Sequence, residues 1–174
     1  QGYTVTVVKP VTLAADDPDG AVLAGLTGSA SDASLVLPSP ESPSQESDGA
    51  EESDKLLNAA AENVQELASQ FDAVIVEGVP RLDTTGAPIA ESPVLAERLG
   101  ARVLGVVAYR RAMGADDVSH WRNTYASSFA GVVLNRETIY AEHDVWSRLV
   151  PAFEDAGVAV IAVIPEQRLL LAPT

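Results

Sequence analysis

Short apolar runs, rich in β-branched residues, alternate along the chain with segments in which apolar residues recur at helical spacing. The runs predict strands over residues 4–8, 35–37, 71–76, 102–108, 129–134 and 158–164. The periodic segments predict helices over residues 54–70, 93–99, 116–127 and 144–156, the second of them closed by Gly100. Continuous apolar runs suit parallel strands that are covered on both faces. The alternation therefore predicts an α/β fold with a mostly parallel sheet flanked by helices.

One stretch departs from this pattern. Between Pro10 and Asp54 there is no Lys or Arg but there are ten acidic residues, which supply −10 of the formal net charge of −14. Its later half, residues 38–54, is rich in Pro, Ser, Glu, Asp and Gly and is too polar to bury. We expect a mobile acidic loop there. The overall negative charge argues against binding to the phosphate backbone of nucleic acids.

The bulk composition sets further limits. A chain of 174 residues with 47% hydrophobic residues suits one domain with a core of its own. It has no Cys, which rules out disulfides and thiolate zinc sites and fits a cytoplasmic protein. No apolar run approaches the ~18 residues that a membrane span needs. Because the chain starts at Gln1, directly before a strand, we expect a single α/β domain over residues 1–174 that is incomplete at its N-terminus.

Residues suited to ligand binding follow four of the predicted strands. Lys9 ends the first, Glu77 and Gly78 follow the run 71–76, Asn135 follows 129–134, and Pro165 follows 158–164. In open parallel sheets, ligands bind in the crevice outside the carboxyl ends of the strands. The four strand ends therefore predict one nucleotide or small-molecule site.

Each of these residues has a functional and a plainer interpretation. The Lys9 ammonium suits a phosphate or carboxylate, or it extends from a strand end into solvent. Glu77 suits Mg²⁺ beside a phosphate, with Gly78 allowing close approach of the ligand, or it is a solvated strand end. Asn135 offers a donor and an acceptor to an adenine edge, or it caps a turn. Pro165 ends the last strand in a similar way, or it simply terminates strand pairing.

Other charged residues are weaker candidates. Asp16, Asp17 and Asp19 fit a metal site less well than a solvated acidic segment. Arg110 and Arg111 follow a strand and suit either a phosphate contact or a solubility role. His120 and His143 are isolated, with no second metal ligand or triad spacing nearby, and favour a structural or surface role.

Four motifs, in this order, resemble the dethiobiotin-synthetase-like family of P-loop NTPases. They are Val-Val-Lys-Pro-Val from residue 7, Val-Ile-Val-Glu-Gly at 74–78, Gly-Val-Val-Leu-Asn-Arg at 131–136, and the ending from Gly157 to Thr174. The closest likeness is to the N-terminal domain of phosphate acetyltransferases; cobyrinic acid a,c-diamide synthases are more distant. The likeness covers most of residues 2–13 and 71–174 and leaves out the acidic stretch.

The resemblance implies ATP and Mg²⁺ at the carboxyl ends of the strands. By this likeness Lys9 approaches the phosphate or substrate as the catalytic lysine, Glu77 organises Mg²⁺, and Asn135 with Pro165 lines the adenine pocket. The sequence departs from the family because it contains no Gly-x-x-x-x-Gly-Lys-[Ser/Thr] phosphate loop, and Val79-Pro80-Arg81 replaces a glycine-rich turn. We expect this chain not to hydrolyse ATP efficiently, and we expect the missing strand, loop and helix to lie upstream or the remaining strands to close the gap.

Three functions remain open on the sequence. The first is a nucleotide-binding-fold regulatory domain that senses a small-molecule ligand and acts on a neighbouring regulatory or acyltransferase domain. The second is an ATP- and Mg²⁺-dependent ligase that joins a carboxylate to an amine. The third is a structural module that forms homo-oligomers. None of the three involves nucleic acid or a membrane.

Overall fold

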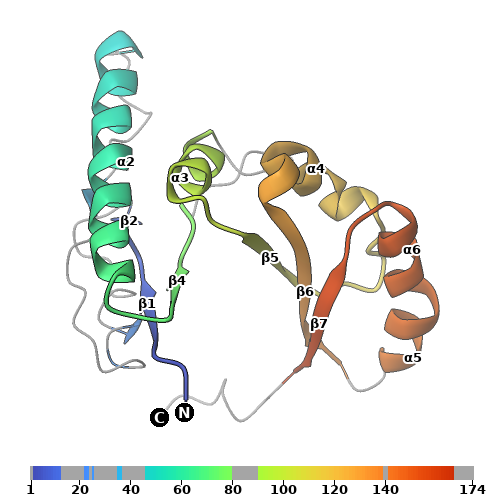
Figure 1. The fold of residues 1–174 in the computed structure, drawn as a ribbon. Coiled ribbons are helices and arrows are strands. Elements are labelled where there is room, and N and C mark those ends of the chain that lie inside the picture. Colours follow the sequence, from blue (N-terminus) through green and yellow to red (C-terminus); the bar gives the residue numbers. More distant parts are fainter. Residues whose placement is uncertain are drawn as a thin grey trace. The chain divides into compact units, whose positions relative to one another are not determined.

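The computed structural model describes residues 2–12, 22–23, 25, 35–36, 46–79, 90–138 and 141–166, without the side chains of 46–50 and 136–137. The chain divides into two compact units (Figure 1). Unit 1 comprises residues 1–83 and 88–100, and unit 2 comprises residues 84–87 and 101–174. The prediction of a single domain stays a prediction.

Unit 1 contains two pairs of parallel strands. β1 (Val5–Val8) pairs with β4 (Ala73–Val76), so that Val8 lies opposite Val76. β2 (Val11–Thr12) pairs with β3 (Leu35–Val36). At the start of the first pair, the Asp72 carboxylate accepts hydrogen bonds from both the backbone N–H and the hydroxyl of Thr4, each at 2.8 Å. These bonds fix the register of β1 against β4 just before the first residue of each strand.

Unit 1 also contains the helices α2 (Glu46–Ala68) and α3 (Glu91–Leu99). They pack against each other and against residues next to the strands. Gly100 ends α3 with φ 60°, the left-handed conformation that glycine adopts without steric cost. The apolar core of this unit consists of Val11, Leu57, Ala60, Ala61, Val79 and Leu95.

The acidic segment is partly helical, which corrects the expectation of a loop over residues 38–54. α2 begins at Glu46, so residues 46–54 extend the helix that we expected to start near Asp54. Apolar periodicity misses this start because the added turns carry no apolar stripe. Glu is nonetheless a good helix former, and Glu51 pairs with Lys55 one turn later at 2.6 Å. Residues 38–45 lie outside the described residues.

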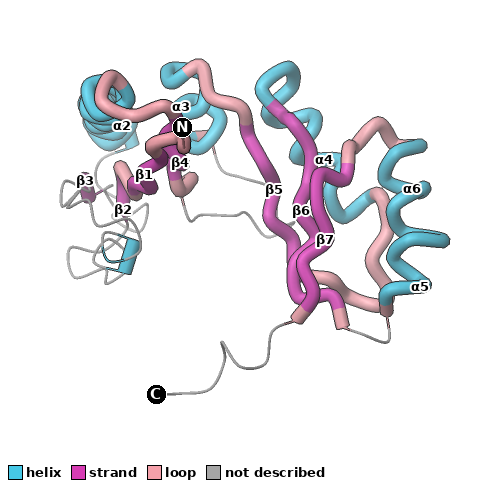
Figure 2. Tube along the Cα trace, turned by 60° about the horizontal axis from the view of Figure 1, so that its bottom comes forward, coloured by secondary structure: helices cyan, strands magenta, loops and turns pink. Residues whose placement is uncertain are grey.

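Unit 2 is built on a three-stranded parallel sheet in the order β5–β6–β7. The strands are β5 (Val103–Ala108), β6 (Phe129–Glu137) and β7 (Val160–Pro165). α4 (Asp116–Tyr125) and the 3₁₀ turn Ala126–Ser128 connect the first two strands. Between β6 and β7 come α5 (Glu142–Asp144), a π-helical turn (Val145–Leu149) and α6 (Val150–Asp155) (Figure 2).

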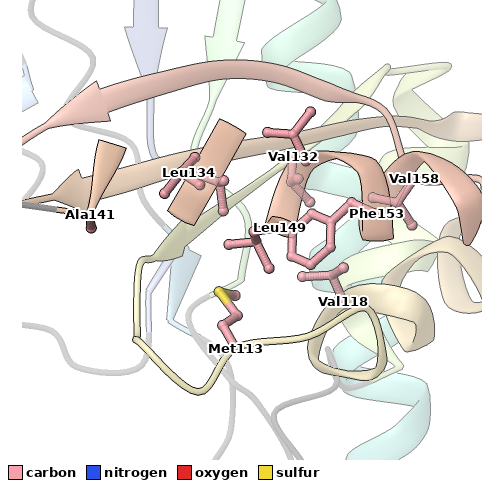
Figure 3. Close-up of a cluster of buried hydrophobic side chains, with 10 residues drawn as sticks. Met113, Val118, Val132, Leu134, Ala141, Leu149, Phe153 and Val158 are labelled. Carbon is pink, nitrogen blue, oxygen red and sulfur yellow. The ribbon is translucent and has the colours of Figure 1, made fainter. Parts of the chain in front are cut away.

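The helices of unit 2 pack on one face of the sheet through a single apolar cluster (Figure 3). Phe153 of α6 and Leu149 of the π-helical turn are fully buried at its centre, against Val132 and Leu134 of β6. The remaining buried members are Met113, Val118, Ala141, Val145, Val150 and Val158. The cluster accounts for the alternation along β6, where Val132 and Leu134 point to the helices.

The fold confirms the predicted α/β class, with parallel strands flanked by helices. β6 continues three residues beyond the predicted end at residue 134, and the helix predicted over 144–156 is interrupted by the π-helical turn. Within the described residues, no helix combines the length and apolarity needed to cross a membrane.

Candidate functional site

Lys9 and Glu77 come together at the carboxyl ends of β1 and β4. Because β1 and β4 run parallel with Val8 opposite Val76, the next residue of each strand lies at the same edge. The Lys9 Nζ lies 3.5 Å from a Glu77 carboxylate oxygen, and the two side chains are 2% and 36% exposed. A buried lysine thus meets a partly exposed carboxylate at the place where open parallel sheets bind ligands.

The segment that carries Glu77 is held at both ends. The Glu77 N–H donates to the Val8 carbonyl at 2.8 Å, which continues the ladder beyond the last strand residue. Two residues later, the Val79 carbonyl accepts a hydrogen bond from the buried Ser92 hydroxyl of α3 at 3.3 Å. Gly78 between them is exposed, and a Cβ built there meets no atom within 4 Å. The backbone beside the Lys9–Glu77 pair is therefore fixed, while the space next to it is open.

Buried polar side chains concentrate around Lys9. In the described part of the chain, the buried polar and charged residues are Thr6, Lys9, Thr12 and Ser92, all of unit 1. Three of them lie within seven residues of each other along β1 and β2. Burial of polar groups is costly unless they are hydrogen-bonded, so such a concentration needs a structural or functional reason.

Asn135 and Pro165 lie at the corresponding edge of unit 2. Asn135, in β6, pairs with Ala108 of β5 and Ile164 of β7, and its carbonyl accepts the Tyr109 N–H at 2.8 Å. Pro165 is the exposed last residue of β7, opposite Glu137. The structure therefore brings Lys9, Glu77 and Gly78 together in unit 1, and places Asn135 and Pro165 at one strand edge in unit 2.

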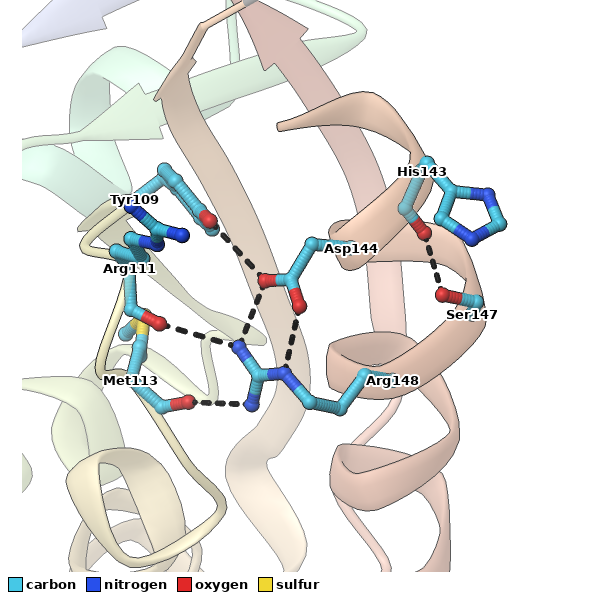
Figure 4. A network of polar contacts seen from close by, with 7 residues as sticks. All are labelled: Tyr109, Arg111, Met113, His143, Asp144, Ser147 and Arg148. Atoms are coloured by element: carbon cyan, nitrogen blue, oxygen red, sulfur yellow. Dashed lines mark hydrogen bonds and ion pairs between the residues drawn. The ribbon is translucent and has the colours of Figure 1, made fainter. Parts of the chain in front are cut away.

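A polar network that the sequence did not suggest surrounds the loop after β5 (Figure 4). Arg148 binds the Asp144 carboxylate through two nitrogens, at 2.7 Å each, and donates to the carbonyls of Met113 and Arg111 at 3.0 and 3.3 Å. The Tyr109 hydroxyl donates to the same carboxylate at 3.1 Å. The network ties the loop that follows β5 to the turn between α5 and α6.

Protonation states follow from this network. The hydrogen bond from Arg148, reinforced by that from Tyr109, lowers the pKa of Asp144 below its usual 3.8. Burial and the neighbouring Asp144 carboxylate raise the pKa of Tyr109 above 10.0. The hydrogen bond to Asp144 raises the pKa of Arg148 as well. At neutral pH the network is thus a charged Arg–Asp pair with a neutral tyrosine, an arrangement suited to holding structure rather than to proton transfer.

The weaker candidates of the sequence have plain roles or lie outside the described residues. Arg110 pairs with Asp117 at 3.1 Å on the surface. His143 is exposed, and its carbonyl accepts a hydrogen bond from Ser147. Asp16, Asp17 and Asp19 lie outside the described residues. Across the part of the chain that is described, no group of three or more His, Cys, Asp or Glu side chains is arranged to hold a metal ion.

No family model matches this chain, and neither a curated protein nor a solved structure matches it. What is established is therefore the α/β architecture with parallel strands flanked by helices. Any proposal about function has to be argued from the residues at the carboxyl ends of the strands.

Proposed function

We propose that the chain is a nucleotide-binding-fold regulatory domain of the dethiobiotin-synthetase-like type, similar to the N-terminal domain of phosphate acetyltransferases. In this proposal it binds a phosphate-bearing small molecule without hydrolysing it and passes the bound state to a neighbouring domain. The P-loop-like fold and the family are part of the proposal, supported by the order of the four strand-end motifs.

The observation that carries the proposal is the buried Lys9 ammonium at the carboxyl ends of β1 and β4. Lysines are rarely buried unless paired, and Glu77, whose carboxylate lies 3.5 Å from the Lys9 ammonium, is itself partly exposed. An ammonium in such a place is suited to an anionic group that enters from the open strand edge. The exposed Gly78 leaves room for that group next to the pair.

The residues present fit a magnesium ion only together with a ligand. Mg²⁺ is commonly bound through one or two protein carboxylates and the phosphates of the substrate, and it keeps several waters. Glu77 supplies one carboxylate, and the phosphates would supply the remaining non-water oxygens. When bound, Mg²⁺ would neutralise phosphate charge that otherwise repels Glu77. The adenine-binding role that the resemblance implies for Asn135 and Pro165 stays a prediction.

The test is isothermal titration of the whole chain with Mg-ATP. We expect saturable binding that falls at least tenfold in Lys9→Met. Lys55→Met serves as the control, since Lys55 is an exposed α2 lysine and its loss changes the net charge equally. Absence of binding, or equal losses in the two variants, would overturn the proposal. Formation of ADP during the titration would favour the alternative of an ATP- and Mg²⁺-dependent carboxylate–amine ligase.

A further inference from the structure

The Lys9–Glu77 ion pair is loose for a pair with one buried member. Charge-assisted hydrogen bonds between an ammonium and a carboxylate are usually about 2.7–2.9 Å long. The observed separation is 3.5 Å, and the exposed fractions of 2% and 36% show that Glu77 is the partner on the solvent side. The carboxylate thus stands beside the buried ammonium without being locked to it by a short hydrogen bond.

The Glu77 side chain is partly open to solvent, with 36% of its surface exposed. Its backbone is fixed by the hydrogen bond to the Val8 carbonyl, but the neighbouring Gly78 faces open space. Because the backbone is held, movement of the carboxylate away from Lys9 is a rotation of the Glu77 side chain. Its exposed position means that water can solvate it after it moves.

An anion bound to the Lys9 ammonium would lie close to the Glu77 carboxylate, which is 3.5 Å from the Lys9 Nζ. Two like charges close together at a partly buried site repel each other strongly, so ligand and Glu77 compete for the ammonium. A metal ion that binds both the carboxylate and the ligand reverses the effect of Glu77 on ligand binding, because each of the two anions is then attracted to the cation.

We propose that Glu77 is a displaceable partner of Lys9: it opposes anion binding when Mg²⁺ is absent and favours it when Mg²⁺ is present. This inference rests on the proposed function, since it concerns the regulation of the same site. Such a partner makes the site selective for phosphate ligands that arrive with a bound metal ion. Metal-free anions would have to displace the carboxylate without compensation.

The experiment measures binding of tripolyphosphate, with and without Mg²⁺, to the wild-type chain and to Glu77→Gln. Without Mg²⁺ the variant should bind about tenfold more tightly than the wild type, since a carboxylate charge near the anion is gone. With Mg²⁺ the order should reverse. Glu62→Gln is the control, because it removes the same charge from an exposed position of α2 in the same unit.

Glu77→Asp provides a second variant that keeps the charge beside the buried lysine. Its shorter side chain draws the carboxylate back, so metal-free binding should lie between those of the wild type and Glu77→Gln. Thermal unfolding of each protein checks that it is folded. Equal metal-free affinities of the wild type and Glu77→Gln, or an equal gain in Glu62→Gln, would overturn this inference and leave the proposed function standing. No binding of tripolyphosphate or Mg-ATP by any of the proteins would overturn both.

Discussion

Gly105→Ala tests the packing of α4 on the sheet of unit 2. Gly105 lies in the middle of β5, and a Cβ built there falls 2.1 Å from both Cε3 and Cζ3 of Trp121 in α4. Carbon atoms in contact normally stay about 3.5–4.0 Å apart, so the indole ring must move by roughly 1.5 Å to admit the methyl group. The glycine is therefore required by the ring that covers it.

Two terms set the size of the effect. Insertion of a methyl group into a packed site costs about 1–3 kcal/mol, and the half-buried Trp121 ring can relieve part of this by shifting outward. Replacement of Gly by Ala restricts the unfolded chain and offsets about 0.4–1 kcal/mol. We expect Gly105→Ala to lower the free energy of unfolding by about 0.5–2 kcal/mol.

The assay is urea unfolding followed by tryptophan fluorescence. Both tryptophans of the chain, Trp121 and Trp146, belong to unit 2, so the signal reports on this unit. In a Trp121→Leu background the ring is gone, and Gly105→Ala should become neutral or stabilising; Trp146 still reports the transition. The packing argument is refuted if Gly105→Ala is harmless in the wild type, or if its cost is the same in both backgrounds.

Gly131→Ala is a matched comparison, because its obstacle is backbone. Gly131 has φ 142°, and an added Cβ would lie 2.4 Å from the Ala159 carbonyl oxygen. This carbonyl accepts the Val132 N–H at 2.8 Å and cannot move aside as a side chain does. We expect a larger loss of stability than for Gly105→Ala, with no rescue by Trp121→Leu; rescue would contradict the assignment of the obstacle to the backbone.

Three further predictions concern other contacts. Phe153→Ala, at a fully buried position, should lower the free energy of unfolding of unit 2 by about 3–5 kcal/mol in urea unfolding; a loss below about 1 kcal/mol would argue against this core. Arg98→Ala removes the hydrogen bonds from α3 to the Asp54 carbonyl and carboxylate of α2, and should cost about 0.5–1.5 kcal/mol in unit 1, measured by circular dichroism. The pKa of Asp144 is lowered in the fold, so its contribution to stability is present above pH 3.8 and is lost as the pH falls through the lowered pKa. In Asp144→Asn the free energy of unfolding should therefore fall less in this acid range than in the wild type. An equal fall in both proteins would contradict the network.

Much of the fold could be predicted because the apolar pattern reports directly on burial. The strand runs and the Gly100 helix end were placed within a few residues, since both depend on local residue types. The start of α2 was missed because residues 46–54 form a helix without an apolar stripe. The π-helical turn at Val145–Leu149 was missed because its spacing differs little from that of an ordinary helix over one turn.

The candidate site, like the fold, could be predicted from the sequence only in part. Lys9 and Glu77 could be named from their places after apolar runs, but their contact depends on β1 pairing with β4, which no local pattern specifies. The network of Tyr109, Asp144 and Arg148 was not predicted. The spacing of Asp144 and Arg148 by four residues was a usable signal for the ion pair, whereas the contact with Tyr109 depends on tertiary structure.

The parallel pairing of the strands also sets the order in which the chain can assemble. β5 and β6 are separated by residues 109–128, whereas β1 and β4 are separated by residues 9–72, a stretch about three times as long. By loop-closure entropy alone, the longer connection costs about 1 kcal/mol more to close. Contacts between distant residues also slow folding, so the sheet of unit 2 should form before that of unit 1. On the ribosome unit 1 emerges first. Its strands β1 and β4 should nevertheless pair more slowly than those of unit 2, which is synthesised later.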